Sequence, residues 1–245
     1  RVWTQVLPYF DQAPLYNLYD PTQAAGAYDR ASTGLQGSTV ASGNDVVVST
    51  VIDVFICPSD DGTRQITTTS SAYAIGGGST LQGAKTSYDF QAHLETSGCT
   101  NWGSRTRNSR YMFGTESSCR LRDVKDGTSN TVMLAETTLD VKDGYTAPWG
   151  YSNWTGAGVD ITWRRGGDYG DAGINFWTCC SWHTPPMANS TFGSVAHWGR
   201  PGSQHVGGVH VALADASVRF ISENTDYNTR LRLGRMADGQ PLGEF

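Results

Sequence analysis

The chain has 245 residues, of which 38% are hydrophobic, 17% charged and 11% aromatic, with 29 glycines and nine prolines. This composition excludes a helical bundle or coiled coil and suits a β-rich chain with many turns, while the aromatic content excludes a disordered one. A net charge of −5 argues against nucleic acid as a partner.

The start of the chain predicts a short helical segment. It begins at Arg1 without a methionine or a signal peptide, so we expect a processed or truncated form whose targeting segment lies upstream. Apolar residues at helical spacing over 6–19, interrupted by two prolines, predict a short helix or helix pair. A second apolar element over 46–56 should end before Pro58.

The middle of the chain contains two strand patterns and a short repeat. Residues 86–93 alternate like a strand, and 131–135 have the apolar pattern of a buried strand. The pentapeptide DVKDG occurs at 123–127 and again at 140–144, which predicts two similar acidic turns.

The last third predicts a hairpin and a helix. Residues 209–213 and 218–221 form the hairpin, and the odd-numbered residues of its first strand share one face. Residues 225–233 predict a short closing helix with Thr225 or Asp226 as its N-cap.

Residues 145–200 are rich in glycine and tryptophan and show no clear periodicity. Exposed aromatic faces can stack on sugar rings, so these tryptophans are candidates for glycan binding; the alternative is that they fill a core poor in aliphatic residues. The candidates are Trp149, Trp154, Trp163, Trp177, Trp182 and Trp198.

Five cysteines favour disulfides and an extracytoplasmic location, as do the low lysine content and the abundant serine, threonine and glycine. A disulfide between Cys99 and Cys119 would close a loop of about 20 residues and add about 3 kcal/mol. The adjacent Cys179 and Cys180 favour separate partners, and Cys57 could pair with one of them. The alternative is five buried thiols.

Catalytic motifs are absent from the sequence: it has no nucleophile elbow, zinc-binding helix motif or phosphate-binding glycine loop. Cys179 or Cys180 could act with His183, but a disulfide explains these cysteines more simply. Glu136 and Asp60 could serve as an acid and a base, although structural hydrogen bonding is the simpler role. We assign no catalytic residue.

Two metal hypotheses arise. Carboxylates in flexible turns can bind Ca²⁺, the alternative being solvated turn residues. The candidate calcium ligands are Asp123, Asp126, Asp140 and Asp143. His205, His210 and Asp215 also invite a metal hypothesis, but residues five apart on one strand point to opposite faces, which argues against it. We expect no other cofactor.

Several segments occur in the order of a known family. His205 is followed by nine residues and Asp215, in HVGGVHVALADASVRFI. The other segments are LPYFDQAPLYN (7–17), FICPSD (55–60), KTSY (85–88), RDVKDGTSNTVMLAE (122–136) and LRLGRMADGQPLGE (231–244). In these segments the chain resembles the planctomycete-type pseudopilins, prepilin-like proteins whose C-terminal signature is His, nine residues, then Asp-Gly. Ala216 stands where the family has Gly.

The resemblance implies an α+β fold: a single pilin-like soluble head over 1–245, with an antiparallel sheet, a short N-terminal helix and long Gly- and Trp-rich loops. Residues 145–200 would be an aromatic-rich insertion or subdomain within it. The matching segments imply structural roles for one set of residues. These are His205, Asp215, Asp126, Gly127, Asn130, Glu136, Cys57 and Asp60.

The function implied by the resemblance is a non-enzymatic structural subunit of a pilus-like or secretion-type assembly, at the cell surface or in the periplasm. Its partners would be other pilin-like subunits, with membrane attachment only through an apolar helix upstream of Arg1. A glycan-binding module acting on extracellular polysaccharide is the alternative, and an enzyme acting on such a polymer is the third hypothesis.

Overall fold

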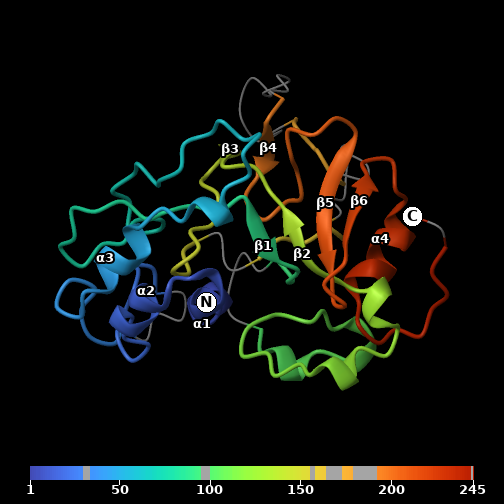
Figure 1. Ribbon diagram of the computed structural model, residues 1–245, viewed down its shortest axis with the longest axis horizontal. Helices are drawn as coiled ribbons and strands as arrows, with labels where there is room; N and C mark the ends of the chain where they lie inside the picture. The colour runs from blue at the N-terminus through green and yellow to red at the C-terminus, as the bar shows by residue number, and fades with distance from the viewer. Residues whose placement is uncertain (30–33, 95–99, 155–157, 164–172, 179–191, 244) are drawn as a thin grey trace.

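A four-stranded antiparallel sheet lies at the centre of the computed structural model, which describes residues 1–29, 34–94, 100–154, 158–163, 173–178, 192–243 and 245. The strand order is β1-β2-β5-β6 (Figure 1). The strands are β1 (Tyr88–Phe90), β2 (Val132–Glu136), β5 (Gly208–Leu213) and β6 (Val218–Ser222). A parallel pair joins β3 (Asp140–Asp143) to β4 (Ser194–His197). The strands expected near 86–93 and 131–135 and the C-terminal hairpin are confirmed.

Short helices surround this sheet and give an α+β fold, as expected. The α-helices are α1 (Val2–Val6), α2 (Ala13–Leu18), α3 (Asn44–Ser49) and α4 (Tyr227–Gly234). Single 3-10 turns are η1 (Leu7–Phe10), η2 (Asp53–Phe55), η3 (Trp102–Ser104), η4 (Arg107–Ser109), η5 (Leu121–Asp123) and η6 (Thr128–Asn130). Across the described ranges, no helix has the length and apolar character needed to cross a membrane.

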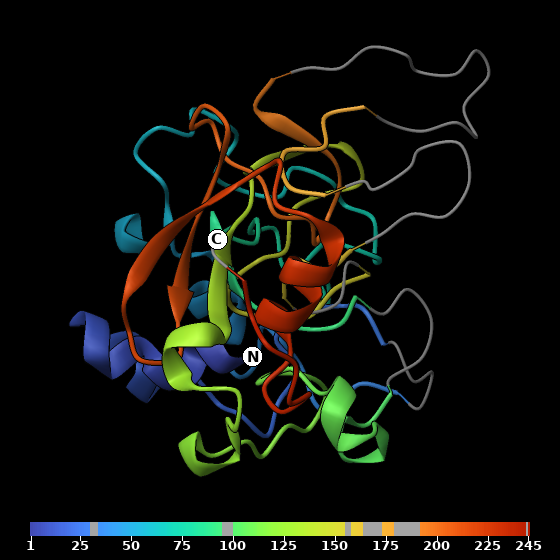
Figure 2. The ribbon, with the colours of Figure 1, turned by 90° about the vertical axis from the view of Figure 1, so that its right-hand side faces the viewer.

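The inner face of the sheet packs against α4 (Figure 2). Val209, Val211 and Leu213 point toward this side and are buried with Leu233 of the helix. Asp226 caps α4 by accepting hydrogen bonds from the first backbone N–H groups, at 2.9 and 3.1 Å. Hydrophobic alternation along β5 and a capping aspartate therefore fix the helix against the sheet.

The outer face of the sheet is covered on its β1 side by the N-terminal helices. The Trp3 ring of α1 lies 4.4 Å from that of Phe55 and 4.7 Å from that of Phe90, between centroids. On the β6 side, Val218 is 66% exposed and Phe220 is 44% exposed. The described part of the chain thus covers one half of this face and leaves the other half open.

The two DVKDG copies do not form similar turns, so that prediction was wrong. In the first copy, Asp123 ends η5 and the chain then turns; the second copy is strand β3, held by parallel pairing with β4. Only the closing glycines agree, with φ of 100° at Gly127 and 89° at Gly144. Pairing with β4 therefore determines the strand structure of 140–143, although 123–126 has the same sequence.

The described parts of 145–200 contribute to the central cores. Trp149 is fully buried in the cluster beneath the N-terminal helices. Val159, Ile161 and Ile174 are buried in the cluster between the sheet and α4. These parts of the region are integrated with the rest of the domain.

Ala216 adopts a left-handed conformation, with φ of 67°, in the turn between β5 and β6. This conformation costs a residue with a Cβ about 1–2 kcal/mol, whereas glycine avoids the cost but is more flexible when unfolded. We therefore expect Ala216→Gly to raise the free energy of unfolding by about 0.5–1 kcal/mol in urea titrations. Ala214→Gly, two residues earlier and without positive φ, should lower it; equal effects would contradict the assignment.

Candidate functional site

Four side chains from separate segments meet at one end of the outer sheet face, and we call them the sheet-end cluster: Cys57, Glu136, His205 and His210. Glu136 ends β2, whereas His210 lies within β5. Cys57 follows η2, and His205 lies three residues before β5 begins. Antiparallel pairing of β2 with β5 brings the end of one strand beside the start of the other.

The cluster is compact and partly buried. The Cys57 Sγ atom lies 3.9 Å from His205 Nε2, and the same nitrogen lies 3.4 Å from Glu136 Oε1. Glu136 Oε2 lies 3.4 Å from His210 Nδ1. Cys57 and Glu136 are buried, while the two imidazoles are partly exposed at the surface. The site is therefore accessible through its histidines.

Neighbouring groups fix the orientation of these side chains. The backbone N–H of His210 donates to Glu136 Oε2 at 2.6 Å, and that of His205 donates to Ser203 Oγ at 3.1 Å. Tyr88 of β1 lies beside Cys57. Burial, and then the nearby Cys57 and Glu136, raise the pKa of Tyr88, so its hydroxyl stays protonated.

A second polar group adjoins the cluster around Asp60. Its carboxylate accepts hydrogen bonds from the backbone N–H groups of Leu139 at 2.8 Å and Gly62 at 3.0 Å, and from Gln204 Nε2 at 3.3 Å. Burial raises the pKa of Asp60 in spite of these donors. Because Gln204 directly precedes His205, this network anchors the loop that carries the histidine.

Buried Lys85 extends this polar group. Its Nζ donates to the Leu139 carbonyl at 2.8 Å and pairs with Asp140 at 3.0 Å. Burial lowers the pKa of Lys85, and the hydrogen bond to Asp140 opposes that shift. The lysine thus joins the KTSY segment to β3.

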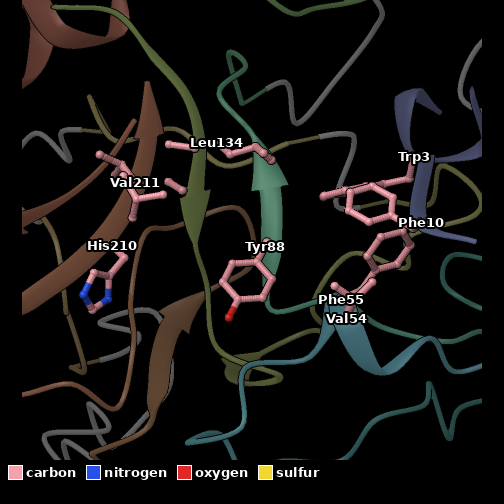
Figure 3. Close-up of a pocket in the computed structure, with 11 residues that line it drawn as sticks. Trp3, Phe10, Val54, Phe55, Tyr88, Leu134, His210 and Val211 are labelled. Atoms are coloured by element: carbon pink, nitrogen blue, oxygen red, sulfur yellow. The ribbon is translucent and has the colours of Figure 1, made fainter. Parts of the chain in front are cut away.

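An apolar groove of about 200 Å³ runs from the cluster across the sheet toward the N-terminal helices (Figure 3). Tyr88, Leu134 and His210 line its sheet side, opposite Phe10 and Val54. The remaining lining residues are Trp3, Phe55, Ala135, Val211, Ala212 and Val218. His210 is shared between the polar cluster and the groove.

The geometry of the cluster differs from a catalytic relay. In a thiol–imidazole–carboxylate relay, the nucleophile and the carboxylate contact opposite ring nitrogens. Here Cys57 and Glu136 face the same nitrogen of His205, Nε2. Converging thiol, imidazole and carboxylate groups are instead the donor types that bind Zn²⁺.

The predicted signature residues fall at two ends of β5. Asp215 accepts from the backbone N–H of Ser217 at 2.9 Å, as expected for a turn aspartate. His205, at the other end of β5, contributes to the sheet-end cluster. The signature of His, nine residues and Asp therefore combines one residue of the sheet-end cluster with one residue of the turn between β5 and β6.

Asp126, Gly127 and Asn130 stabilise the turn before β2. Asp126 accepts from the backbone N–H of Gly239 at 2.9 Å, which anchors the C-terminal segment. Asn130 Nδ2 donates to the Asp126 carbonyl at 3.0 Å. These contacts tie the turn before β2 to the C-terminal segment.

The four calcium candidates have different environments. Asp123 accepts from the Arg120 backbone N–H at 2.9 Å, while Asp143 lies 3.3 Å from His197 Nδ1. Asp126 binds the C-terminal segment and Asp140 pairs with Lys85. Within the described ranges, the acidic, histidine and cysteine side chains that group as metal ligands are Cys57, Glu136 and His205. Calcium binding stays an untested prediction.

The structure describes two of the five cysteines. Cys57 and Cys119 are free thiols. Cys119 packs against Met236, with sulfur atoms 3.5 Å apart. Cys99, Cys179 and Cys180 lie outside the described residues.

The tryptophans do not share one environment. Trp149 is a core residue, and the Trp163 ring lies 4.8 Å beneath the Arg200 guanidinium. Trp154 is 38% exposed, with its ring 5.6 Å from Tyr28. Trp177 and Trp198 are half-buried, and Trp182 lies outside the described residues. Trp149 is therefore unavailable for glycan binding, and binding by the others stays a prediction.

The sequence identified the members of the sheet-end cluster but did not show that they lie together. Sequence reasoning considered His210 with His205 and Asp215 but not with Cys57 or Glu136, and it gave Tyr88 and Gln204 no individual role. The KTSY segment, which contains Tyr88, was the available signal. The strand-parity argument failed for His205 because β5 begins only at Gly208.

Comparison with known proteins assigns the chain to a family. The family model described as "Protein of unknown function (DUF1559)" matches residues 1–228, and the chain belongs to this family. No curated protein and no solved structure shows a significant match to the chain.

Proposed function

We propose that the protein is a non-enzymatic structural subunit of a pilus-like or secretion-type assembly at the cell surface or in the periplasm. Copies of the chain would associate through the open half of the outer sheet face. The observation that carries this proposal is the apolar groove across β2 and β5, next to exposed apolar residues of β6.

The open half-face has the character of an association surface. Val218 is 66%, Val54 55%, Phe220 44% and Phe10 38% exposed, and three of these four line the groove. Contiguous exposed apolar surface is rare on monomeric proteins and is typical of interaction sites. As the edge strand of the sheet, β6 also offers backbone groups for pairing.

A second copy of the chain suits this surface because exposed apolar side chains lie next to the apolar groove. Tyr9, beside groove residue Phe10, is 85% exposed, and Val206, beside His205, is 91% exposed. A two-fold interface requires such a self-complementary patch. The resemblance to pseudopilins supports the same type of partner.

The absence of a catalytic relay in the sheet-end cluster supports a non-enzymatic role. Cys57 and Glu136 meet at one nitrogen of His205, which leaves no relay through the imidazole ring. The adjoining groove is apolar, which suits a protein side chain more than a polar polymer.

Sedimentation velocity over a concentration series tests this proposal. We expect the wild-type sedimentation coefficient to rise with concentration and Val218→Asp, which places a charge at the groove, to abolish the rise. Val46→Asp is the matched control, because Val46 is 53% exposed on α3, far from β6 in Figure 1. A concentration-independent wild type, or equal loss in both variants, would refute association through this face.

A further inference from the structure

Three ligand atoms converge in the sheet-end cluster from segments far apart in the chain. Cys57 Sγ, a carboxylate oxygen of Glu136 and a ring nitrogen of His205 all lie within 4.8 Å of one another. Two of the separations are 3.9 Å, between Sγ and Nε2, and 3.4 Å, between Nε2 and Oε1. The atoms surround one point at the sheet end.

These separations match what a tetrahedral metal ion requires. Zn²⁺ binds cysteine sulfur at about 2.3 Å and histidine nitrogen or carboxylate oxygen at about 2.0–2.2 Å. Tetrahedral angles then place sulfur and nitrogen about 3.5 Å apart, and nitrogen and oxygen about 3.3 Å apart. Small side-chain movements would bring the observed atoms into this geometry.

We propose that Cys57, Glu136 and His205 bind a divalent transition metal ion, preferentially Zn²⁺. Thiolate and imidazole donors favour Zn²⁺ over Ca²⁺ and Mg²⁺, which prefer oxygen ligands. On binding, the Cys57 sulfur–hydrogen bond is replaced by a sulfur–metal bond and the proton leaves to solvent. The ion neutralises the thiolate and the Glu136 carboxylate, which are otherwise costly to bury together.

The surrounding hydrogen bonds suit a metal site because they orient the ligands. Tyr88 contacts Cys57, and the His210 backbone N–H holds Glu136. Such outer contacts tune affinity in known metal sites. The His210 ring, 4.8 Å from the His205 ring between centroids, lies beside the three ligands, and water would complete the tetrahedral coordination of the ion.

An ion here would have a structural consequence that is independent of self-association. It would link the loop after η2, the end of β2 and the loop before β5. These three segments form the polar end of the open sheet face. Metal binding would therefore stabilise this end of the face, whether or not a second copy docks on it.

Cobalt titration of the reduced, metal-stripped chain tests the site. We expect one equivalent of Co²⁺ to produce a thiolate-to-metal charge-transfer band and tetrahedral visible bands, which Zn²⁺ then displaces. Cys57→Ser should abolish the thiolate band, and His205→Gln should weaken binding at least about tenfold. Cys119→Ser is the matched control, since Cys119 is also a free thiol but packs against Met236.

The variants also separate ligand loss from misfolding. His205 is 31% exposed at its side chain, so His205→Gln should retain the metal-free circular dichroism spectrum and melting temperature. Absence of stoichiometric binding to the wild type would overturn the proposal. A thiolate band that persists in Cys57→Ser, or disappears in Cys119→Ser, would also overturn it by placing the metal elsewhere.

Discussion

Replacement of Trp149 by alanine should lower the free energy of unfolding by about 3–5 kcal/mol. The side chain is fully buried in the core beneath the N-terminal helices, with its ring 5.8 Å from that of Phe55. Its indole N–H also donates to the Thr50 carbonyl at 3.0 Å. The substitution would create a cavity and remove this buried hydrogen bond.

Urea unfolding of Trp149→Ala, compared with Trp154→Ala, measures this effect. Trp154 comes from the same Trp-rich region but is 38% exposed, so its replacement should cost about 1 kcal/mol. Similar midpoints for the two variants would contradict a core role for Trp149. A folded Trp149→Ala protein that lost only glycan binding would do the same.

The second large effect concerns Asp89, a buried carboxylate that ties the first helix to the sheet. It forms an ion pair with Arg1, and both side chains are almost inaccessible. It also accepts hydrogen bonds from the Trp3 indole at 3.2 Å and from the backbone N–H groups of Phe90 at 2.9 Å and Gly158 at 3.1 Å. Asp89→Ala would leave these donors and the guanidinium without their acceptor.

We expect Asp89→Ala to cost about 3–5 kcal/mol, because it leaves a buried charge uncompensated. Asp53→Ala is the control: Asp53 pairs with Arg64 at 3.2 Å, with both side chains exposed, so its loss should cost at most about 1 kcal/mol. Thermal and urea unfolding distinguish the two variants. Equal small losses would show that Asp89 does not anchor the helix.

Local sequence signals predicted the elements whose structure depends on near neighbours. Alternation over 209–213 and 218–221 predicted β5 and β6, and Asp226, one of the two predicted N-cap candidates, caps α4. The short helix or helix pair predicted over 6–19 corresponds to η1 and α2, while α1 precedes it. These features follow from side-chain periodicity and capping, which a single segment specifies.

Distant contacts explain where sequence reasoning failed. The copy of DVKDG at 140–144 became β3 because β4, more than fifty residues later, pairs with it. Nothing within the pentapeptide distinguishes the two copies. Likewise, Cys57 and His205 are separated by 148 positions, so only the folded chain brings them together.

The resemblance identified several members of the site without showing that they meet. Cys57, Glu136 and His205 were each expected to have structural roles, but from three different motifs. Their convergence depends on the register between β2 and β5, in which Ala135 pairs with Val211. That register carries no local sequence signal beyond the apolar face of each strand.

Photo-crosslinking from position 218 in the cells that produce this protein tests the central claim, which is assembly through the open sheet face. With a photoreactive amino acid at Val218, we predict covalent dimers of this chain in the cell envelope. The same residue at Val46, which is also exposed but lies on α3, should give few dimers. Absence of dimers from position 218, or equal dimer yields from both positions, would contradict the account.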